Sequence, residues 1–299
     1  MSSKSGAAAV CWPRYAGYES RIVGATATRE YAEMADTYTH GHHPSVLKSH
    51  TWRTVKNSAA YLSEHLRPGS IVLDVGCGPG NLTADIAAHV APGQVVGIDA
   101  GTEVIAQAST EFGASAKFPV EFSVGDVYAL DFADDFFDIV HAHQVLLHLT
   151  DPVAALKEMK RVTRPGGMVA ARDSDYAMFT WAPDNEHLTR WLEIYRTVAR
   201  HNNAEPDAGR YLLGWAHAAG FDDVTFSSST WTFATQEDRD FWGLMWADRI
   251  LESAIASQAI EYGVCERAEL QIISEAFREW TANPDATFIV PHCEIIARA

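Results

Sequence analysis

Short apolar runs alternate with helical patterns along the middle of the chain. The runs fall at residues 71–75, 95–99, 120–123, 137–141 and 168–172. Between and after them, apolar spacing predicts helices over about 81–91, 102–112, 144–147 with 152–163, 185–202 and 207–219. Alternating strands and helices are typical of a parallel sheet covered by helices on both faces.

The flanking segments complete this pattern. A helical pattern covers 46–66, a sixth strand covers about 220–233, and a long helical block covers about 236–281. A final strand is expected at 287–290 and 293–297, with Pro291 interrupting it so that only one half pairs centrally. We therefore predict an α/β fold with a seven-stranded Rossmann-like sheet, its last strand antiparallel. Residues 1–29 are expected to be a flexible tail, and 30–299 a single domain in which 236–283 form a helical lid.

Composition narrows the class of partner. The 299 residues carry a formal net charge of -16, which disfavours nucleic acids and anionic membranes because no basic face is available. The four cysteines form no C-x-x-C pair, as expected in a reducing cytosol, and no apolar run reaches the length of a membrane span. We expect a cytoplasmic protein, a monomer or homodimer, that acts on a small molecule and uses no metal.

The turn after the first apolar run carries the most specific chemistry. The stretch IVLDVGCGPGN places Gly76, Gly78 and Gly80 at alternate positions, with Asp74 just before them. A dinucleotide site needs G-x-G-x-x-G, and Asn81 stands where its last glycine would fall. A carboxylate would repel a pyrophosphate but attract a sulfonium and an ammonium group. The turn therefore favours S-adenosylmethionine (SAM) over a nicotinamide dinucleotide.

Acidic residues follow three successive strands. Asp74 ends the first, Asp99 ends the second and Asp126 follows the third. In a doubly wound sheet these ends meet at the ligand-binding edge. Asp99 can accept hydrogen bonds from ribose hydroxyls, Asp126 from the adenine amino group, and Asp74 can orient the glycine turn. Each residue alone is equally consistent with a turn or helix-capping role.

The order of these motifs resembles that of the class I SAM-dependent methyltransferases. VLDVGCGPG, VVGIDAG, GDVYAL, FDIVHAHQVLLHLTDP and MKRVTRPGGMVAARDSD cover roughly residues 66–176, and are most similar to the ubiquinone/menaquinone C-methyltransferase-like group. The resemblance implies a cofactor site whose members are Gly76, Cys77, Gly78 and Gly80 beside the methionine part, Asp99 and Ala100 at the ribose, Asp126 and Val127 at the adenine, and Ala142 or His143 near the methionine amino group.

The resemblance extends upstream. YTHGHHPSVLKSHTWRTVKNSAAYL is similar to the N-terminal segment of a subgroup that includes fungal thiol bis-methyltransferases, and many of its members have no known substrate. In that subgroup the segment folds over the cofactor, so Tyr38 and Arg53 are candidates to hold the cofactor carboxylate. An exposed structural arginine is the alternative for Arg53.

Histidines supply the candidate base on the acceptor side. His143 is preferred because it follows a strand, with His148 and His42 as further candidates. Packing, helix capping, or a metal bound by the H-x-H-H cluster are the alternatives. Asp173 and Asp175 could poise a base or cap a loop. An aromatic stripe on the helical block could line an acceptor pocket, although such a stripe is more often core; its members are Phe241, Trp242, Met245, Trp246 and Arg249, with Trp181, Trp191 and Tyr195 nearby.

The sequence thus predicts a SAM-dependent methyltransferase, EC 2.1.1.-, acting on a small and largely apolar metabolite. The methylated atom is a thiol, a hydroxyl or an activated carbon, with a slight preference for thiol from the subgroup. A quinone-ring C-methyltransferase is the alternative enzyme. A SAM-binding protein without catalysis is the alternative of another class, and a helical block sealed over a filled interior would favour it.

Overall fold

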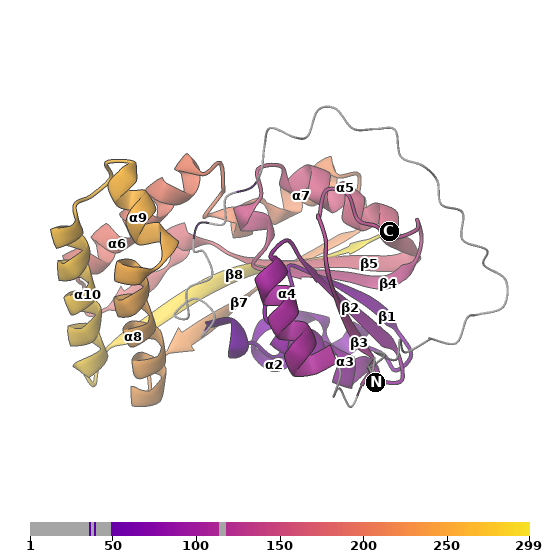
Figure 1. Cartoon of the computed structure of the whole chain (residues 1–299), viewed down its shortest axis with the longest axis horizontal. Coiled ribbons are helices and arrows are strands. Elements are labelled where there is room, and N and C mark those ends of the chain that lie inside the picture. Colours follow the sequence, from indigo (N-terminus) through magenta and orange to yellow (C-terminus); the bar gives the residue numbers. More distant parts are fainter. Residues whose placement is uncertain (1–35, 37–38, 40–48, 114–117) are drawn as a thin grey trace, which may run out of the picture. The chain divides into compact units, whose positions relative to one another are not determined.

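The computed structural model describes residues 36, 39, 49–113 and 118–299. The predictions for the tail at 1–29, for Tyr38 and for His42 lie outside these residues. Five strands are parallel and ordered β3-β2-β1-β4-β5 (Figure 1). Their bounds are β1 Ile71–Val75, β2 Gln94–Asp99, β3 Val120–Val124, β4 Phe137–His143 and β5 Thr163–Ser174.

Three further strands extend the sheet beyond β5. β8 (Thr287–Arg298) pairs antiparallel with β5, with β7 (Val224–Phe233) and with the short β6 (Thr180–Ala182). The α/β fold class and the antiparallel last strand are therefore confirmed. The sheet has eight strands rather than seven, because β6 is too short to leave a signal in the sequence.

The predicted interruption at Pro291 is wrong, because β8 is continuous through it. The Pro291 carbonyl accepts a hydrogen bond from the Asp175 N–H, on the side of β8 that faces β5 and β6. In an antiparallel strand the N–H and C=O of one residue point to the same side. The missing N–H therefore falls in the gap between the pairing with β5, which ends at His292, and that with β6, which begins at Ile289.

Two other boundaries differ from the prediction. The single helix expected over 46–66 is, within its described part, a short α2 (Val55–Ser58) followed by a 3-10 turn, Ala60–His65. Ala59 has a φ of -138°, which interrupts the helical backbone between them. β5 also begins before the predicted residue 168, at Thr163. It includes Gly166 and Gly167, where its register against β4 shifts.

Helices cover both faces of the sheet. α2 and α3 (Asn81–Val90) pack on one face with the core of Val72, Ile86 and Ala170, while α4 (Thr102–Ala108) packs beside β2 and β3. α5 (Pro152–Val162) and α7 (Leu212–Ala218) cover the other face (Figure 1).

A third core lies among the remaining helices. α6 (Glu186–His201), α8 (Gln236–Glu252), α9 (Ala254–Glu261) and α10 (Arg267–Ala282) pack with β6 and the ends of β7 and β8 (Figure 1). The predicted aromatic stripe belongs to this core, where Trp242, Met245 and Trp246 are buried with Trp191 and Tyr195. Their rings contact one another, as in the edge-to-face pair of Trp191 and Trp246 at 4.5 Å.

Candidate functional site

The glycine turn joins β1 to α3 in a backbone conformation that only glycine adopts easily. Gly76, Gly78 and Gly80 have φ values of +67°, +55° and +87°. A Cβ on Gly76 would lie 2.4 Å from Val145 Cγ2. Only a residue without a side chain therefore lets the turn pack this closely against the residues after β4. Gly80 is the N-cap of α3. The turn therefore brings bare backbone to the carboxyl edge of the sheet, with the N-terminus of α3 directly after it.

Asp99 lies beside this turn at the end of β2. Its Oδ2 accepts a hydrogen bond from Gly78 N at 3.0 Å, and its Oδ1 accepts one from Gly101 N at 2.9 Å. These two hydrogen bonds fix the orientation of the carboxylate. Because Asp99 is also partly exposed, its remaining lone pairs are accessible to a ligand. Ala100, the next residue, is exposed.

Asp126 occupies the equivalent place after β3. Its side chain is exposed and accepts a hydrogen bond from Tyr128 N at 2.9 Å, which is a local turn contact. Val127 is half-buried beside it. Because β1, β2 and β3 are adjacent and parallel, the structure brings Asp74, Asp99 and Asp126 to one edge of the sheet.

Asp74 differs from the other two because it is buried, with an exposed fraction of 2%. Its Oδ2 accepts a 2.6 Å hydrogen bond from Thr83 Oγ1 in α3, and its Oδ1 lies 2.8 Å from His141 Nδ1 in β4. Both carboxylate oxygens are thus engaged inside the protein. Asp74 fixes the first turn of α3 relative to β1 and β4, and Cys77 beside it is buried.

His143 lies at the end of β4 in a buried aromatic setting. It is 3% exposed, its ring contacts Trp231 at 5.7 Å and His292 at 6.2 Å, and neither ring nitrogen has a partner among the described residues. Burial, followed by the charges of Arg53 and Arg172, holds its pKa well below the usual value. The imidazole is therefore neutral at pH 7.

His292 holds the neighbouring position on β8. Its Nδ1 donates to Val290 O at 3.0 Å, and its Nε2 lies 2.8 Å from Gln144 Nε2, which assigns Nε2 as the acceptor. Burial also lowers its pKa well below the usual value. Gln144 in turn accepts a hydrogen bond from Ser174 Oγ at 3.0 Å, so the loop after β4 is tied to both β5 and β8.

A buried ion pair lies beside His143, because Arg172 is the neighbour of His143 on β5 and Glu294 is the neighbour of Arg172 on β8. Arg172 Nε in β5 lies 3.1 Å from Glu294 Oε1 in β8, and both side chains are almost fully buried. Ser227 Oγ donates to Glu294 Oε2 at 2.8 Å. The sequence patterns did not single out His292 and Glu294. The signal was their spacing, because two polar residues two positions apart in an apolar strand point to the same face of the sheet.

The remaining candidates have mainly structural contacts. Asp173 is buried and accepts a hydrogen bond from Leu147 N, and burial raises its pKa to about 7. Asp175 forms a double ion pair with Arg210 at 2.6 and 2.7 Å. His148 is half-buried, and desolvation with the Arg53 charge lowers its pKa to about 3. Asp173 therefore follows the loop-capping alternative, whereas the Asp175 carboxylate is an ion-pair partner and caps no helix among the described residues.

The segment before α2 lies against the glycine turn. His50 Nδ1 is 3.4 Å from the place where a Cβ on Gly78 would lie. Ser49 Oγ accepts a 2.9 Å hydrogen bond from Arg249 Nη2 in α8, which joins this segment to the helical core. Arg53 carries charge close enough to affect the pKa values of His143 and His148. These contacts place 49–53 over the carboxyl edge of the sheet.

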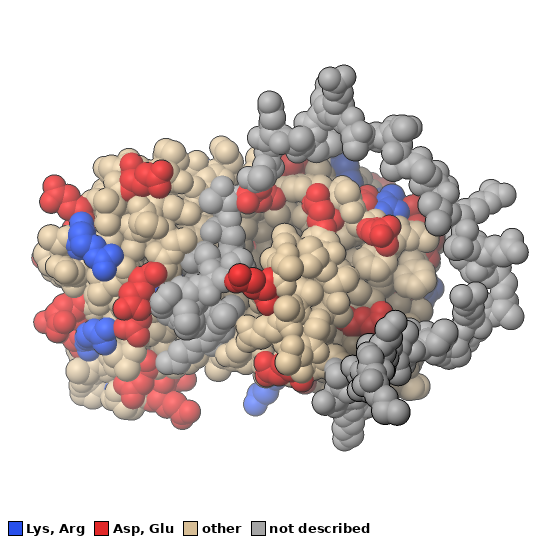
Figure 2. Space-filling view, viewed as in Figure 1, with Lys and Arg blue, Asp and Glu red and all other residues tan. Residues whose placement is uncertain are grey.

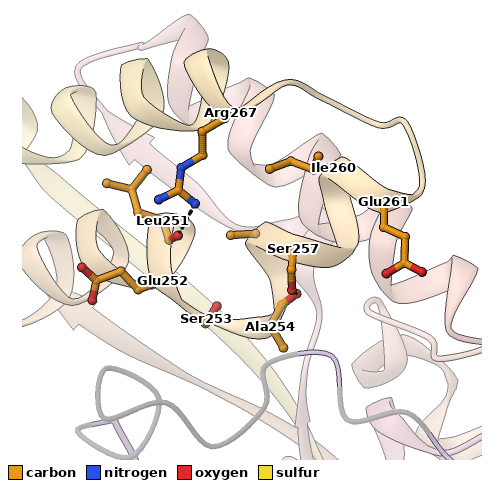
Figure 3. A pocket seen from close by; sticks show the side chains of 9 residues that line it. Leu251, Glu252, Ser253, Ala254, Ser257, Ile260, Glu261 and Arg267 are labelled. Carbon is orange, nitrogen blue, oxygen red and sulfur yellow. Dashed lines mark hydrogen bonds between the residues drawn. The ribbon is translucent and has the colours of Figure 1, made fainter.

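One hollow lies away from the carboxyl edge of the sheet. A shallow depression of about 630 Å³ is formed by the end of α8, by α9 and by the start of α10 (Figure 3). Arg267 Nη1 donates to Leu251 O at 2.7 Å across it, and Glu252 and Glu261 are on its rim. No side chain identified above lines it, so it does not belong to the candidate site. Among the described residues, no group of three or more His, Cys, Asp or Glu side chains could hold a metal ion.

Comparisons with known proteins agree with this geometry. A family model described as a methyltransferase domain matches residues 73–171. A methyltransferase of Schizosaccharomyces pombe is 31% identical, over 89% of this chain and 95% of the relative. A demethylmenaquinone methyltransferase of Beutenbergia cavernae is 34% identical, over 55% of this chain and 70% of the relative.

The solved structures give the same fold. The YcgJ protein of Bacillus subtilis has a TM-score of 0.52 and 18% identity, over 81% of this chain and 98% of that chain. The sheet order, the glycine turn and the near full-length match to the Schizosaccharomyces pombe relative all indicate the same family. The chain belongs to the class I SAM-dependent methyltransferase family.

Proposed function

We propose that this protein binds SAM at the carboxyl edge of β1, β2 and β3 and methylates a small, largely apolar acceptor with an acidic proton. The observation that carries the proposal is Asp99, which two backbone amides hold beside the glycine turn with its carboxylate partly exposed. A ribose diol is the group that such a carboxylate accepts best. Bound SAM supplies an electrophilic methyl group on a sulfonium.

The residues around Asp99 fit the rest of this cofactor. The turn from Gly76 to Gly80 has no side chains that would keep a ligand from the backbone, apart from Cys77 and Pro79, which are buried. Asp126 is exposed at the next strand end, where an adenine amino group can donate to it. His143 at the end of β4 is our candidate for the residue nearest the methyl group. The roles of Tyr38 and His42 stay predictions.

Methyl transfer needs alignment of the acceptor and the removal of one proton. The acceptor atom forms a bond to the methyl carbon, the carbon–sulfur bond breaks with its electron pair remaining on sulfur, and the acceptor proton passes to a base. His143 is neutral at pH 7 and has two unpartnered nitrogens among the described residues. Its lowered pKa makes it a weak base, so it suits a thiol, a phenol or an activated carbon better than an aliphatic alcohol.

Two alternatives each have one supporting observation. A quinone-ring C-methyltransferase is supported by the similarity to demethylmenaquinone methyltransferases. A SAM-binding protein without catalysis is supported by the filled aromatic core of α6, α8 and α10, where Trp191 and Trp246 leave no pocket between them. The unpartnered polar atoms of His143 favour catalysis over this second alternative.

The proposal is tested with methyl-labelled SAM and a panel of dithiols, phenols and quinols. We expect transfer of label to at least one thiol or phenol, and we expect His143→Asn to slow turnover by roughly 100-fold, the usual contribution of a general base. Calorimetry should show that this variant binds S-adenosylhomocysteine as the wild type does. Binding of the cofactor without transfer to any acceptor would favour the non-catalytic alternative, and an equal loss of binding and turnover would remove His143 from catalysis.

A further inference from the structure

Three side chains on one face of the sheet hold buried polar atoms that have no partner among the described residues. They are Arg172 Nη1, the Tyr61 hydroxyl and both ring nitrogens of His143. Buried polar atoms without a hydrogen bond cost free energy, so they are rare in folded proteins. The three residues come from the 3-10 turn after α2, from β4 and from β5, and they lie on one face of the sheet. Together they indicate a binding site for a polar group.

Arg172 is held so that one of its nitrogens is left over. Its Nε lies 3.1 Å from Glu294 Oε1, and its Nη2 donates to Ser229 Oγ at 3.1 Å. Its guanidinium carbon lies 5.1 Å from the centre of the Trp231 ring. These contacts fix the plane of the guanidinium group, and both N–H groups of Nη1 remain as donors of known position.

Tyr61 is a second buried donor, and its ring packs against the core on the same face of the sheet. The charges of Glu294 and Arg172 both act on its hydroxyl, and burial raises its pKa well above the usual value. The hydroxyl therefore keeps its proton and can donate it in a hydrogen bond. Trp231 supplies an apolar ring between Arg172 and His143, because it contacts His143 at 5.7 Å and Arg172 at 5.1 Å.

The charge of this cluster selects the kind of group that it can bind. Glu294 already compensates Arg172, and His143 and His292 are neutral. Arg53 adds a positive charge near His143, while Asp74 and Asp173 act on the Tyr61 hydroxyl with the same sign as Glu294. A second full negative charge would therefore be poorly compensated, whereas a neutral oxygen acceptor would satisfy the two donors. A ketone or amide carbonyl has the required two lone pairs.

We propose that Arg172 Nη1 and the Tyr61 hydroxyl form a subsite for a carbonyl oxygen of the acceptor, which places the neighbouring nucleophilic atom at His143. This inference rests on the proposed methyltransferase function and narrows its substrate to ring-bearing molecules with a carbonyl close to the methylated atom. The carbonyl would also make a neighbouring thiol or carbon more acidic, which suits a weak base.

The subsite is covered in this structure by the segment around α2. Trp231 Nε1 donates to Asn57 O at 2.6 Å, and Trp52 packs on the Trp231 ring at 5.2 Å. An acceptor therefore reaches Arg172 only when Trp52 and Asn57 move away from Trp231, whereas Tyr61 lies beyond the break in the helical backbone at Ala59. The segment is held by the buried side chains of Val55, Ala59 and Leu62 and by the 2.7 Å hydrogen bond from Val55 N to Asp85 Oδ2.

The test uses two probes that differ only by the carbonyl oxygen, tetralone and tetralin. Their affinities are measured by ligand-observed NMR in the presence of saturating S-adenosylhomocysteine. The wild type should bind tetralone about tenfold more tightly than tetralin, the scale of one hydrogen bond to a charged or buried donor. Tyr61→Phe and Arg172→Lys should each reduce this preference several-fold.

Tyr262→Phe is the matched control, because Tyr262 donates its hydroxyl to Asn202 Oδ1 at 2.8 Å in the helical layer. Its preference for tetralone should equal that of the wild type. If Arg172→Lys fails to fold, Tyr61→Phe alone tests the subsite. This substitution removes only the hydroxyl oxygen and should leave the packing of the ring unchanged. Equal binding of the two probes, binding of neither, or an unchanged preference in Tyr61→Phe would overturn the subsite. Binding of S-adenosylhomocysteine in the same samples separates these outcomes from a failure of the proposed function.

Discussion

At the scale of single residues, the sequence predicts positions at strand ends but not the contacts between residues that are distant in the chain. The strand-end positions of Asp99 and Asp126 follow from the apolar pattern alone, because parallel strands share one carboxyl edge. The partners of Asp74 do not, since Thr83 and His141 reach it only through the packing of α3 and β4. The same holds for Arg172 and Glu294, which are 122 positions apart in the sequence.

Asp173 gives a prediction about pH and stability. Burial raises its pKa from 3.8 to about 7, so the folded state binds its proton more tightly than the unfolded chain does. Between about pH 4 and pH 7 the folded protein keeps this proton while the unfolded chain has lost it, so this group lowers stability as pH rises through that window. Asp173→Asn retains an oxygen that can accept the hydrogen bond from Leu147 N and removes the titration.

The measurement is the free energy of unfolding in urea at pH 5 and pH 7.5 for both proteins. On going to the higher pH, the wild type should lose about 2 to 4 kcal/mol relative to the variant. The comparison with the variant is essential, because His143, His148 and His292 have lowered pKa values and act with the opposite sign. Parallel pH profiles of wild type and variant would show that Asp173 titrates normally.

At the scale of elements, patterns predicted the regular parts of the sheet better than its irregular edge. β1 agrees with the apolar run residue by residue, because a central parallel strand is buried on both faces. β6 and the continuity of β8 through Pro291 depend on which neighbours a strand finds, and no local pattern records that. The helix predicted over 46–66 is interrupted because its residues bind to β7 and α3 instead.

The turn between β1 and α3 supports a second prediction. Gly76→Ala would put a Cβ 2.4 Å from Val145 Cγ2 at a φ of +67°, so the backbone or the loop after β4 must move. We expect a loss of roughly 1–2 kcal/mol from the left-handed backbone alone, and weaker binding of S-adenosylhomocysteine. Calorimetry and thermal unfolding measure the two effects.

Gly214→Ala is the control for this substitution. Gly214 lies in α7, and a Cβ added there would meet nothing within 4 Å, so alanine should leave cofactor binding unchanged and raise stability slightly. If Gly76→Ala behaved in the same way, the close approach between the glycine turn and the loop after β4 would have no role in binding.

At the scale of the whole molecule, the fold is that of the methyltransferase family and the surface is acidic. Figure 2 shows acidic side chains spread over much of the visible face, with few basic ones among them, as the net charge of -16 leads one to expect. Among the described helices, none combines the length and apolar character needed to cross a membrane. The fold belongs to a family with many substrates, so the acceptor must be inferred from the residues at the site.

The central claim is that the carboxylate of Asp99 binds the ribose of SAM beside the glycine turn. Isothermal calorimetry with S-adenosylhomocysteine tests it most directly on the wild type, on Asp99→Ala, and on Asp222→Ala, in which an exposed aspartate far along the sequence is removed. We predict that Asp99→Ala weakens binding roughly 10- to 100-fold, the value of one or two hydrogen bonds to a charged group, while Asp222→Ala binds as the wild type does. Equal affinity of all three proteins, with their folds intact, would contradict the account.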